Sequence, residues 1–323
     1  MQLRWLADQF FVEGLFLGDV SLQTARCGGM TIDTRVAVVV ASTGRPHELR
    51  DLLRALSRQT VQPSRIVLSV SDDGDLPDDI PHDVAIVFGD KGAAAQRNRG
   101  LDLAQDEADL VVFVDDDYLP TEGMIGGVIA VFATFEDVVG CNGRLLADGI
   151  NGPGIGYDEA QKLLNDHERS GADDVNIRDV LDGLYGCNMA FRAAAIGKVR
   201  FDENLPFYSW QEDIDFAAQL MGRGRLIRSD GFAGVHRGVK RGRGSGVRFG
   251  YSQVVNPIYL ARKKTMKWSY ALKIMRNNVL ANLLKMFFPE AWVDRRGRVL
   301  GNIIGLRDVV LGKDDPRNIR NLG

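Results

Sequence analysis

Three consecutive carboxylates, Asp115, Asp116 and Asp117, are the residues of this chain whose types and spacing most clearly suggest chemistry. They follow the run 111–114, which reads VVFV and predicts a buried strand because β-branched and aromatic residues favour strands. Like charges held side by side repel, and burying them without a partner is unfavourable. A hard divalent cation such as Mg²⁺ or Mn²⁺ relieves that repulsion, because both ions prefer oxygen ligands. The run therefore predicts a site for a metal ion and a diphosphate, with a solvated acidic turn as the alternative.

Three further groups could contribute to such a site. Glu212 and Asp213 open a predicted helix, where they could act as catalytic acids or bases or simply complement the helix dipole. His236 ends a short predicted strand and could ligate a metal, although a single histidine is more often structural. Arg97 lies on a helix of small residues and could donate a forked pair of hydrogen bonds to phosphate, or it could be part of a solvated face.

The elements that would position these groups alternate regularly. We predict strands at 36–41, 65–70, 84–88 and 110–114 and helices at 46–59, 92–104 and 121–132. Such alternation indicates an α/β fold with a mostly parallel, Rossmann-like nucleotide-binding sheet and helices on both faces. Ligands of these sheets bind at the carboxyl ends of the strands. The polar clusters 42–45, 71–75 and 115–117 all follow strands, so we expect them to share that edge of the sheet.

Composition divides the chain into three parts: an N-terminal extension (1–34), a catalytic α/β domain (35–237), and a Gly/Arg loop with basic helices (238–323). Between residues 237 and 308 there are 16 Lys and Arg against 3 Asp and Glu, although the whole chain has a net charge of −3. This asymmetry favours a polyanionic partner for the last part: a phosphate group, an anionic lipid or a nucleic acid. The extension is either an accessory helix or the result of a start codon assigned too early, with Met30 as the true start.

The later elements are less regular. We predict strands at 138–146, 185–191, 226–227 and 232–235 and helices at 211–221, 251–264, 269–288 and 301–311. The region 268–288 mixes apolar residues with Lys273, Arg276 and Lys285. A helix of this kind can lie on an anionic membrane surface, or it can pack on the catalytic domain and expose its charges.

Other patterns are excluded by the sequence. The three cysteines (Cys27, Cys141 and Cys187) lie far apart and form neither a zinc motif nor a disulfide framework, which favours a reducing compartment. No apolar run reaches the roughly 18 residues of a membrane-spanning helix. There is no Walker loop and no Gly-x-Gly-x-x-Gly motif, which argues against ATPases and dehydrogenases. We therefore expect a cytoplasmic protein, with peripheral contact to the inner face of the cell membrane as a further expectation.

The order of the motifs resembles the family 2 glycosyltransferases of GT-A fold, a group of inverting enzymes of bacterial-type glycan biosynthesis. Over about residues 35–237 the matching motifs are VVVASTGRP, LSVSDDGD, AAQRNRG, VVFVDDD, GCNMAFR, WQEDIDFAAQL and GVHR. Each motif is weak alone, but seven in the same order are specific. The chain lacks the Gln-x-x-Arg-Trp motif of the processive synthases, which argues for transfer of single sugars.

The resemblance implies a role for each matching position. Residues implied in donor binding are Thr43, Arg45, Asp72, Asp73, Arg97, Asn98, Asp115 and Asp116. Residues implied as ligands of Mn²⁺ or Mg²⁺ are Asp117, Asp115 and His236. Asp213 is implied as the general base, with Glu212 beside it. Residues assigned to the acceptor side or to a closing loop are Asn188, Trp210, Arg241 and Arg243, and Lys240 would be a further phosphate donor.

The expected reaction is metal-dependent transfer of a sugar, with inversion, from a UDP- or dTDP-sugar to a hydroxyl group of a glycan or lipid-linked acceptor. One base and one metal are sufficient for this chemistry, because the base takes the hydroxyl proton and the metal offsets the charge of the leaving diphosphate. Two alternatives remain. A sugar-phosphate nucleotidyltransferase would share the sheet, but ASTGRPHEL lacks its Gly-rich, Lys-containing signature. A nucleic-acid-binding protein would use KRGRGSGVR but would leave the acidic residues unexplained, so we expect no nucleic-acid partner.

Overall fold

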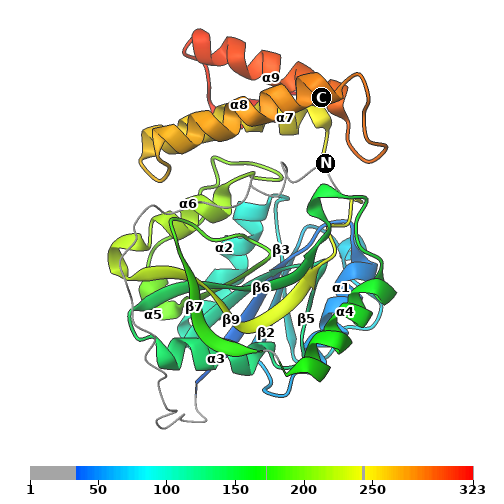
Figure 1. The fold of residues 1–323 in the computed structure, drawn as a ribbon, viewed down its shortest axis with the longest axis vertical. Helices are drawn as coiled ribbons and strands as arrows, with labels where there is room; N and C mark the ends of the chain where they lie inside the picture. Colours follow the sequence, from blue (N-terminus) through cyan, green and yellow to red (C-terminus); the bar gives the residue numbers. More distant parts are fainter. Residues whose placement is uncertain (1–33, 172, 242–243, 323) are drawn as a thin grey trace.

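The computed structural model describes residues 34–322 apart from residues 172, 242 and 243 (Figure 1). The proposed N-terminal extension and the choice between its two explanations therefore lie outside the described residues. The described chain forms a central sheet with strand order β3-β2-β1-β4-β8-β6-β9-β5, and β7 pairs with β9 outside this sequence of neighbours. The strands are β1 (Val36–Ala41), β2 (Arg65–Val70), β3 (Val84–Phe88), β4 (Leu110–Asp115), β5 (Tyr118–Pro120), β6 (Val138–Asp148), β7 (Asp174–Leu181), β8 (Asn188–Arg192) and β9 (Arg225–His236).

The first half of the sheet is parallel, as the alternation of elements predicts. β1 lies between β2 and β4, and Ala41 at its end is in register with Ser69 on one side and Asp115 on the other. The three strands therefore end at the same edge of the sheet. The polar clusters that follow them meet there, which confirms the expectation from sequence.

The second half is mixed. β8 runs antiparallel to β4 and to β6, while β6 and β9 are parallel to each other. β9 is one strand of 12 residues, where sequence patterning predicts two short ones. Its last residue, His236, is in register with Asp148 of β6 and with Tyr118 of β5. This pairing brings His236 to the residues that follow β4.

Helices cover both faces of the sheet. Side chains of β1 alternate between them: Val38 packs with α1 (Pro46–Ser57) and α3 (Met124–Thr134), and Val39 packs against α2 (Ala93–Ala104) and the core that includes α6 (Glu212–Ala218). A Cβ atom on Gly100 of α2 would lie 2.4 Å from Val39, so this helix can approach the sheet only with glycine at that position. Two further helices are α4 (Tyr157–Ser170), which sequence patterning does not predict, and the short α5 (Ala193–Ile196). This architecture of a mostly parallel sheet covered by helices on both faces, with helices after β9, confirms the predicted α/β fold class.

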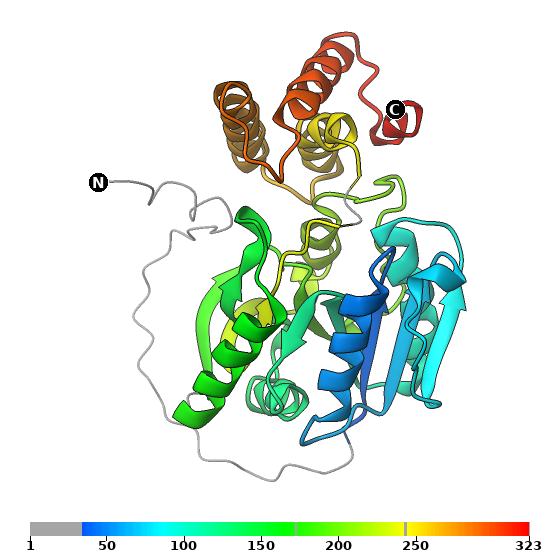
Figure 2. The same ribbon diagram turned by 90° about the vertical axis from the view of Figure 1, so that its right-hand side faces the viewer.

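Three long helices follow β9 and lie together at one end of the molecule (Figures 1 and 2). They are α7 (Gly246–Lys263), α8 (Trp268–Lys285) and α9 (Arg295–Val310). α7 and α9 begin five and six residues earlier than predicted. Ser245 caps α7 by accepting a hydrogen bond from the Val247 N–H, and Asp294 caps α9 in the same way through Gly297. Within the described part of the chain, no helix combines the length and the apolar character needed to cross a bilayer.

Candidate active site

The three carboxylates after β4 have different surroundings. Asp116 turns inward, where it accepts hydrogen bonds from the Ser42 hydroxyl (2.8 Å) and the Arg45 guanidinium (2.8 Å). These contacts fully engage both of its oxygens and make it a link between β1 and β4. Asp115 and Asp117 point instead towards His236. The middle carboxylate therefore holds the turn, and the outer two form the candidate metal site.

Asp115, Asp117 and His236 each offer one ligand atom, and these atoms all lie within 4.8 Å of one another. The Nε2 atom of His236 is 3.4 Å from Oδ1 of Asp117 and 3.9 Å from Oδ2 of Asp115. Asp117 and His236 are buried, whereas Asp115 is partly open to solvent. Two carboxylates and one imidazole form a donor set suited to a divalent cation with one open side.

The other ring nitrogen of His236 is held by neighbours. Nδ1 lies 2.8 Å from Oδ1 of Asp148 and 3.2 Å from the Tyr185 hydroxyl. A carboxylate partner fixes the proton on Nδ1 and leaves Nε2 to bind a metal. Burial lowers the pKa of His236, but the charges of Asp117 and Asp148 outweigh it and raise the pKa to about 10.

The buried side chain of Asp117 provides a test of whether a cation fits. Its Oδ2 atom accepts a hydrogen bond from the Val239 N–H (2.7 Å), while its Oδ1 atom has no hydrogen-bond partner among the described residues. An unsatisfied buried carboxylate oxygen is costly unless a cation or another donor meets it. Because this oxygen is the one that faces Nε2 of His236, the residues present fit a metal ion.

Residues 238–241 lie over this cluster and are fixed at several points. The Arg45 guanidinium donates to the backbone carbonyls of Val239 (2.9 Å) and Arg241 (2.8 Å). Lys240 donates to the carbonyls of Gly149 (2.9 Å) and Ile150 (2.8 Å) across the site. The segment that enters the C-terminal helices is therefore attached to both sides of the acidic cluster.

The second pair of carboxylates opens α6 after an irregular turn. Phe207, Ser209 and Gln211 have φ angles of 60°, 54° and 79°, values that residues other than glycine rarely adopt. Strain of this kind persists only where the surrounding structure fixes it, and it concentrates at functional sites. Here the turn sets the direction of Glu212 and Asp213.

Asp213 is oriented by two backbone donors. Its Oδ2 accepts from the Gly186 N–H and its Oδ1 from its own helix at the Ile214 N–H, both at 2.8 Å. Burial raises the pKa of Asp213, and Arg97 and these hydrogen bonds oppose the shift. A carboxylate with a raised pKa is a stronger base, which suits it to accept a proton from a hydroxyl group.

Arg97 connects the two acidic groups. Its guanidinium donates to Oδ1 of Asp115 (2.8 Å) and pairs with Glu212. Burial and the neighbouring Asp213 raise the pKa of Glu212 to about 8, against the effect of Arg97. The candidate metal ligands Asp115, Asp117 and His236, which we call the cation-type cluster because they could hold a cation, therefore form one site with the candidate base. The buried guanidinium of Arg97 joins the two parts.

The comparison with known families agrees with this geometry. A family model described as glycosyl transferase family 2 matches residues 37–199, half of the chain. The chain belongs to this family. It is therefore a glycosyltransferase that uses a nucleotide-sugar donor, and the resemblance inferred from the motifs is confirmed.

Solved structures similar to this glycosyltransferase are remote in sequence. A structure of S. aureus TarS residues 1–349 has 12% identity and a TM-score of 0.48, covering 89% of this chain and 90% of that one. The same fragment in complex with UDP has 13% identity, a TM-score of 0.47 and the same coverage. The mannosyltransferase PcManGT from Pyrobaculum calidifontis, in complex with GDP-Man and Mn²⁺, has 15% identity, a TM-score of 0.49, and coverage of 86% and 89%. No curated protein matches the glycosyltransferase.

Only some of the residues implied in donor binding lie at the site. Thr43 is at the shared edge of the sheet, 3.4 Å from Ser71, and Arg97 is in the centre of the site. Asp72 and Asp73 are exposed on a short 3₁₀ turn after β2. Their roles in the glycosyltransferase stay predictions.

Three implied residues have structural contacts that occupy their side chains. Arg45 holds Asp116 and residues 238–241, as described above. The Asn98 amide donates to the Phe201 carbonyl (3.0 Å), and its oxygen accepts from the Phe201 N–H (2.8 Å). Asn188 is buried between strands and donates to Gly143 (3.2 Å). For these residues the structure identifies a positioning contact, and direct contact with a ligand is not tested.

The remaining assignments lie near the base and the loop. Trp210 precedes Glu212, and its ring meets Phe249 edge-to-face at 5.9 Å. The side chain of Arg241 is 60% exposed and 3.9 Å from Glu48. Arg243 lies outside the described residues. The proposed phosphate-donating role of Lys240 is not tested, and its ammonium group binds backbone carbonyls in this structure.

Sequence reasoning missed three residues of the site. Asp148 and Tyr185 support His236, but they reach it only through the pairing of β6 with β9 and the loop before β8. Asp75 is buried and accepts from the Gly44 N–H (2.5 Å) and the Ser71 N–H (2.8 Å), which ties the ends of β1 and β2 together. The available sequence signal for Asp75 was its position in the DDGD motif, where it is the acidic residue that follows the glycine.

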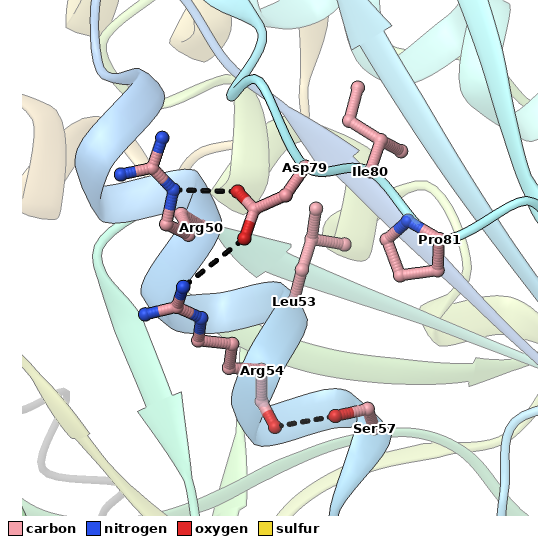
Figure 3. Close-up of a pocket in the computed structure, with 7 residues that line it drawn as sticks. All are labelled: Arg50, Leu53, Arg54, Ser57, Asp79, Ile80 and Pro81. Atoms are coloured by element: carbon pink, nitrogen blue, oxygen red, sulfur yellow. Dashed lines mark hydrogen bonds and ion pairs between the residues drawn. The ribbon is translucent and has the colours of Figure 1, made fainter.

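A separate hollow lies on the outer side of α1. Figure 3 shows Arg50 and Arg54 turned towards Asp79, with hydrogen bonds of 2.7 and 3.1 Å. Leu53 and Pro81 complete its wall. It shares no residue with the site described above, and its charged side chains pair with one another.

Proposed function

We propose that this glycosyltransferase is a metal-dependent inverting enzyme that transfers one sugar from a nucleoside-diphosphate sugar to a hydroxyl group of a glycan or lipid-linked acceptor. The observation that carries the proposal is the bridge made by Arg97 between Asp115 of the cation-type cluster and Glu212 beside Asp213. Such a bridge couples the two groups that an inverting transfer needs: one that neutralises the leaving diphosphate and one that accepts the acceptor proton.

In this proposal Asp115, Asp117 and His236 hold a divalent cation. When bound, the cation would offset the negative charge that develops on the leaving diphosphate. Mn²⁺ is favoured over Mg²⁺, because Mg²⁺ is held almost entirely by oxygen and His236 supplies a nitrogen. Asp148 and Tyr185 keep the imidazole oriented so that Nε2 faces the two carboxylates.

Asp213 acts as the general base. Its backbone donors hold the carboxylate in place, and burial strengthens it as a base. It would take the proton of the acceptor hydroxyl as the oxygen attacks the anomeric carbon, and the diphosphate would leave from the opposite face with inversion. Arg97 pairs with Glu212 and holds it beside Asp213, whose own carboxylate is oriented by two backbone donors.

The segment 238–241 excludes water from the donor. Its attachment to Arg45 and to residues 149–150 places backbone over the acidic cluster, and exclusion of water limits hydrolysis of an activated sugar. UDP- and dTDP-sugars are the donors that the proposal favours.

A direct test is release of nucleoside diphosphate from UDP-, dTDP-, GDP- and CDP-sugars in the presence of a bacterial lipid-glycan extract. Release from one donor class that stops with EDTA supports the proposal. Release of pyrophosphate from a nucleoside triphosphate and a sugar phosphate would instead support the nucleotidyltransferase alternative. Release that continues in EDTA would contradict the metal-dependent mechanism.

A further inference from the structure

The outer surface of α8 and α9 carries large apolar side chains. Six of them, each between 49% and 84% exposed, define what we name the outer apolar face: Leu272, Leu284, Phe287, Leu300, Ile303 and Val310. Leu284 and Phe287, which follows the end of α8, are three residues apart, and the three residues of α9 are separated by three and seven, so on each helix they lie towards one side. Exposed apolar patches of this extent mark sites of interaction.

The opposite, inward side of the same helices contains a buried polar network, next to the apolar residues Ala271 and Ile274 of α8. Buried Asn282 of α8 donates to Gln253 of α7 (2.7 Å) and to Asn302 of α9 (2.9 Å). Asn302 in turn donates to the Gly250 carbonyl (2.7 Å). A surface helix in water normally exposes polar residues, whereas here large apolar side chains are exposed and amide side chains are buried between the helices.

Glycines bring these helices unusually close. A Cβ atom on Gly301 of α9 would lie 2.0 Å from the Val247 carbonyl oxygen of α7, and one on Gly250 would lie 2.1 Å from that of Arg298. Gly301 and Gly305 are four residues apart, as are Gly246 and Gly250. Close contact through small residues, with amide side chains hydrogen-bonded between helices, is the packing found where the surroundings of a helix bundle are apolar.

The charges around the outer apolar face are mostly positive. Exposed basic residues on or next to these helices include Lys264, Lys273, Arg276 and Arg296, and Arg307 is exposed but pairs with Asp308 (2.8 Å). Within residues 264–311 the exposed carboxylate is Asp294, which caps α9. Positive charges that flank an apolar helix face complement the headgroups of anionic lipids. A second copy of this chain fits less well, because a symmetric pair would place like charges together.

From these observations we propose that the outer apolar face docks this protein on the surface of an anionic lipid bilayer, with α8 and α9 lying in the plane of the membrane. The inner side of α8 packs near Trp210 and Ile214, next to Asp213. One helix diameter, about 10 Å, therefore separates the lipid-facing surface from this part of the site. The inference goes beyond the proposed reaction and does not depend on which donor the enzyme uses.

Vesicle flotation of the full-length protein tests the proposal without an activity measurement. Vesicles of phosphatidylcholine alone are compared with vesicles that contain phosphatidylglycerol in equal parts. The variant Leu284→Gln/Phe287→Gln removes apolar contacts at side chains that are already exposed, and Val180→Gln changes an exposed apolar residue of β7 as the matched control. A second variant, Lys273→Glu/Arg276→Glu, reverses charge and leaves the apolar residues unchanged.

We expect wild type and Val180→Gln to float with the anionic vesicles and to bind neutral vesicles much more weakly. Loss of each large apolar contact should weaken partitioning roughly tenfold. Reversing each charge should weaken binding to anionic vesicles at least roughly fivefold. Unchanged flotation of Leu284→Gln/Phe287→Gln would overturn the proposal, as would failure of wild type to bind either vesicle. A dimer in light scattering that Leu284→Gln/Phe287→Gln separates, without vesicle binding, would show that a second copy covers the face.

Discussion

Replacing Asp213 by asparagine separates a catalytic role from a structural one. Both oxygens of the carboxylate accept backbone hydrogen bonds, from Gly186 and from Ile214, each at 2.8 Å. An asparagine keeps one oxygen but turns an N–H group towards the other donor. The loss of one buried hydrogen bond should reduce the free energy of unfolding by about 1–3 kcal/mol.

The effect on turnover should be larger. A positioned general base contributes a factor of about 10²–10⁴ to the rate. This corresponds to about 3–5 kcal/mol in the activation free energy. Donor affinity should change little, because Arg97 and Glu212 lie between Asp213 and the cation-type cluster. The variant is therefore expected to bind nucleotide like wild type and to transfer almost no sugar.

The assay combines kcat, the Kd of the nucleoside diphosphate, and thermal unfolding, with Asp215→Asn as the matched control. Asp215 is on the same helix and is buried, but it pairs with Lys263 (2.7 Å) and Thr265 (2.6 Å), away from the site. Its replacement should lower stability by a similar amount and preserve kcat of the folded enzyme. Turnover in Asp213→Asn within a few-fold of wild type would refute the reasoning, as would an equal loss of kcat in Asp215→Asn.

Three further predictions follow from the same site. Asp148→Asn should weaken Mn²⁺ binding about 10–100-fold, because His236 loses the carboxylate that fixes its tautomer; calorimetry with Mn²⁺ checks this, and unchanged affinity would contradict it. In wild type, kcat/KM should rise with pH through the pKa of Asp213, because only the ionised carboxylate accepts a proton. Burial raises that pKa, so the acid limb of the pH–rate profile should lie above the usual range of aspartate. An acid limb within the usual range would count against the assignment of Asp213 as the base. Arg97→Met should lower the free energy of unfolding by about 3–5 kcal/mol, because Glu212 loses its buried partner. Urea unfolding measures this change. A loss below about 1 kcal/mol would show that the Arg97 bridge is not structurally important.

Local patterning was sufficient for the first half of the sheet. The runs around Val38, Leu68 and Val112 are apolar and rich in β-branched residues, and each is followed by polar residues, so strand, sheet edge and site could be inferred together. The three residues predicted as metal ligands, Asp115, Asp117 and His236, also lie together in the structure. These agreements arise because parallel strands with short connections place sequence motifs predictably at one edge.

The second half depends on pairing between distant segments. His236 contacts Asp148, 88 residues away in the sequence, because β6 and β9 pair side by side. The pairing includes register shifts that no local sequence pattern encodes. Similarly, α9 starts at Arg295, six residues before the predicted start, because Asp294 caps it and Gly301 lets it approach α7. The apolar residues of α8 were expected to be a lipid-facing or packing surface. The arrangement of the helices divides them, because Ala271 and Ile274 are buried whereas Leu272 and Leu284 are exposed.

The central claim is that the acidic cluster binds a metal and a nucleoside diphosphate together. Isothermal titration with UDP, dTDP, GDP and CDP, each with Mn²⁺ and then with EDTA, tests it most directly. The account predicts binding of one nucleotide class with Mn²⁺ and its loss in EDTA, and the same loss when Asp117 is replaced by asparagine. Binding that is equally tight in EDTA, or no binding to any of the four by the folded protein, would contradict it.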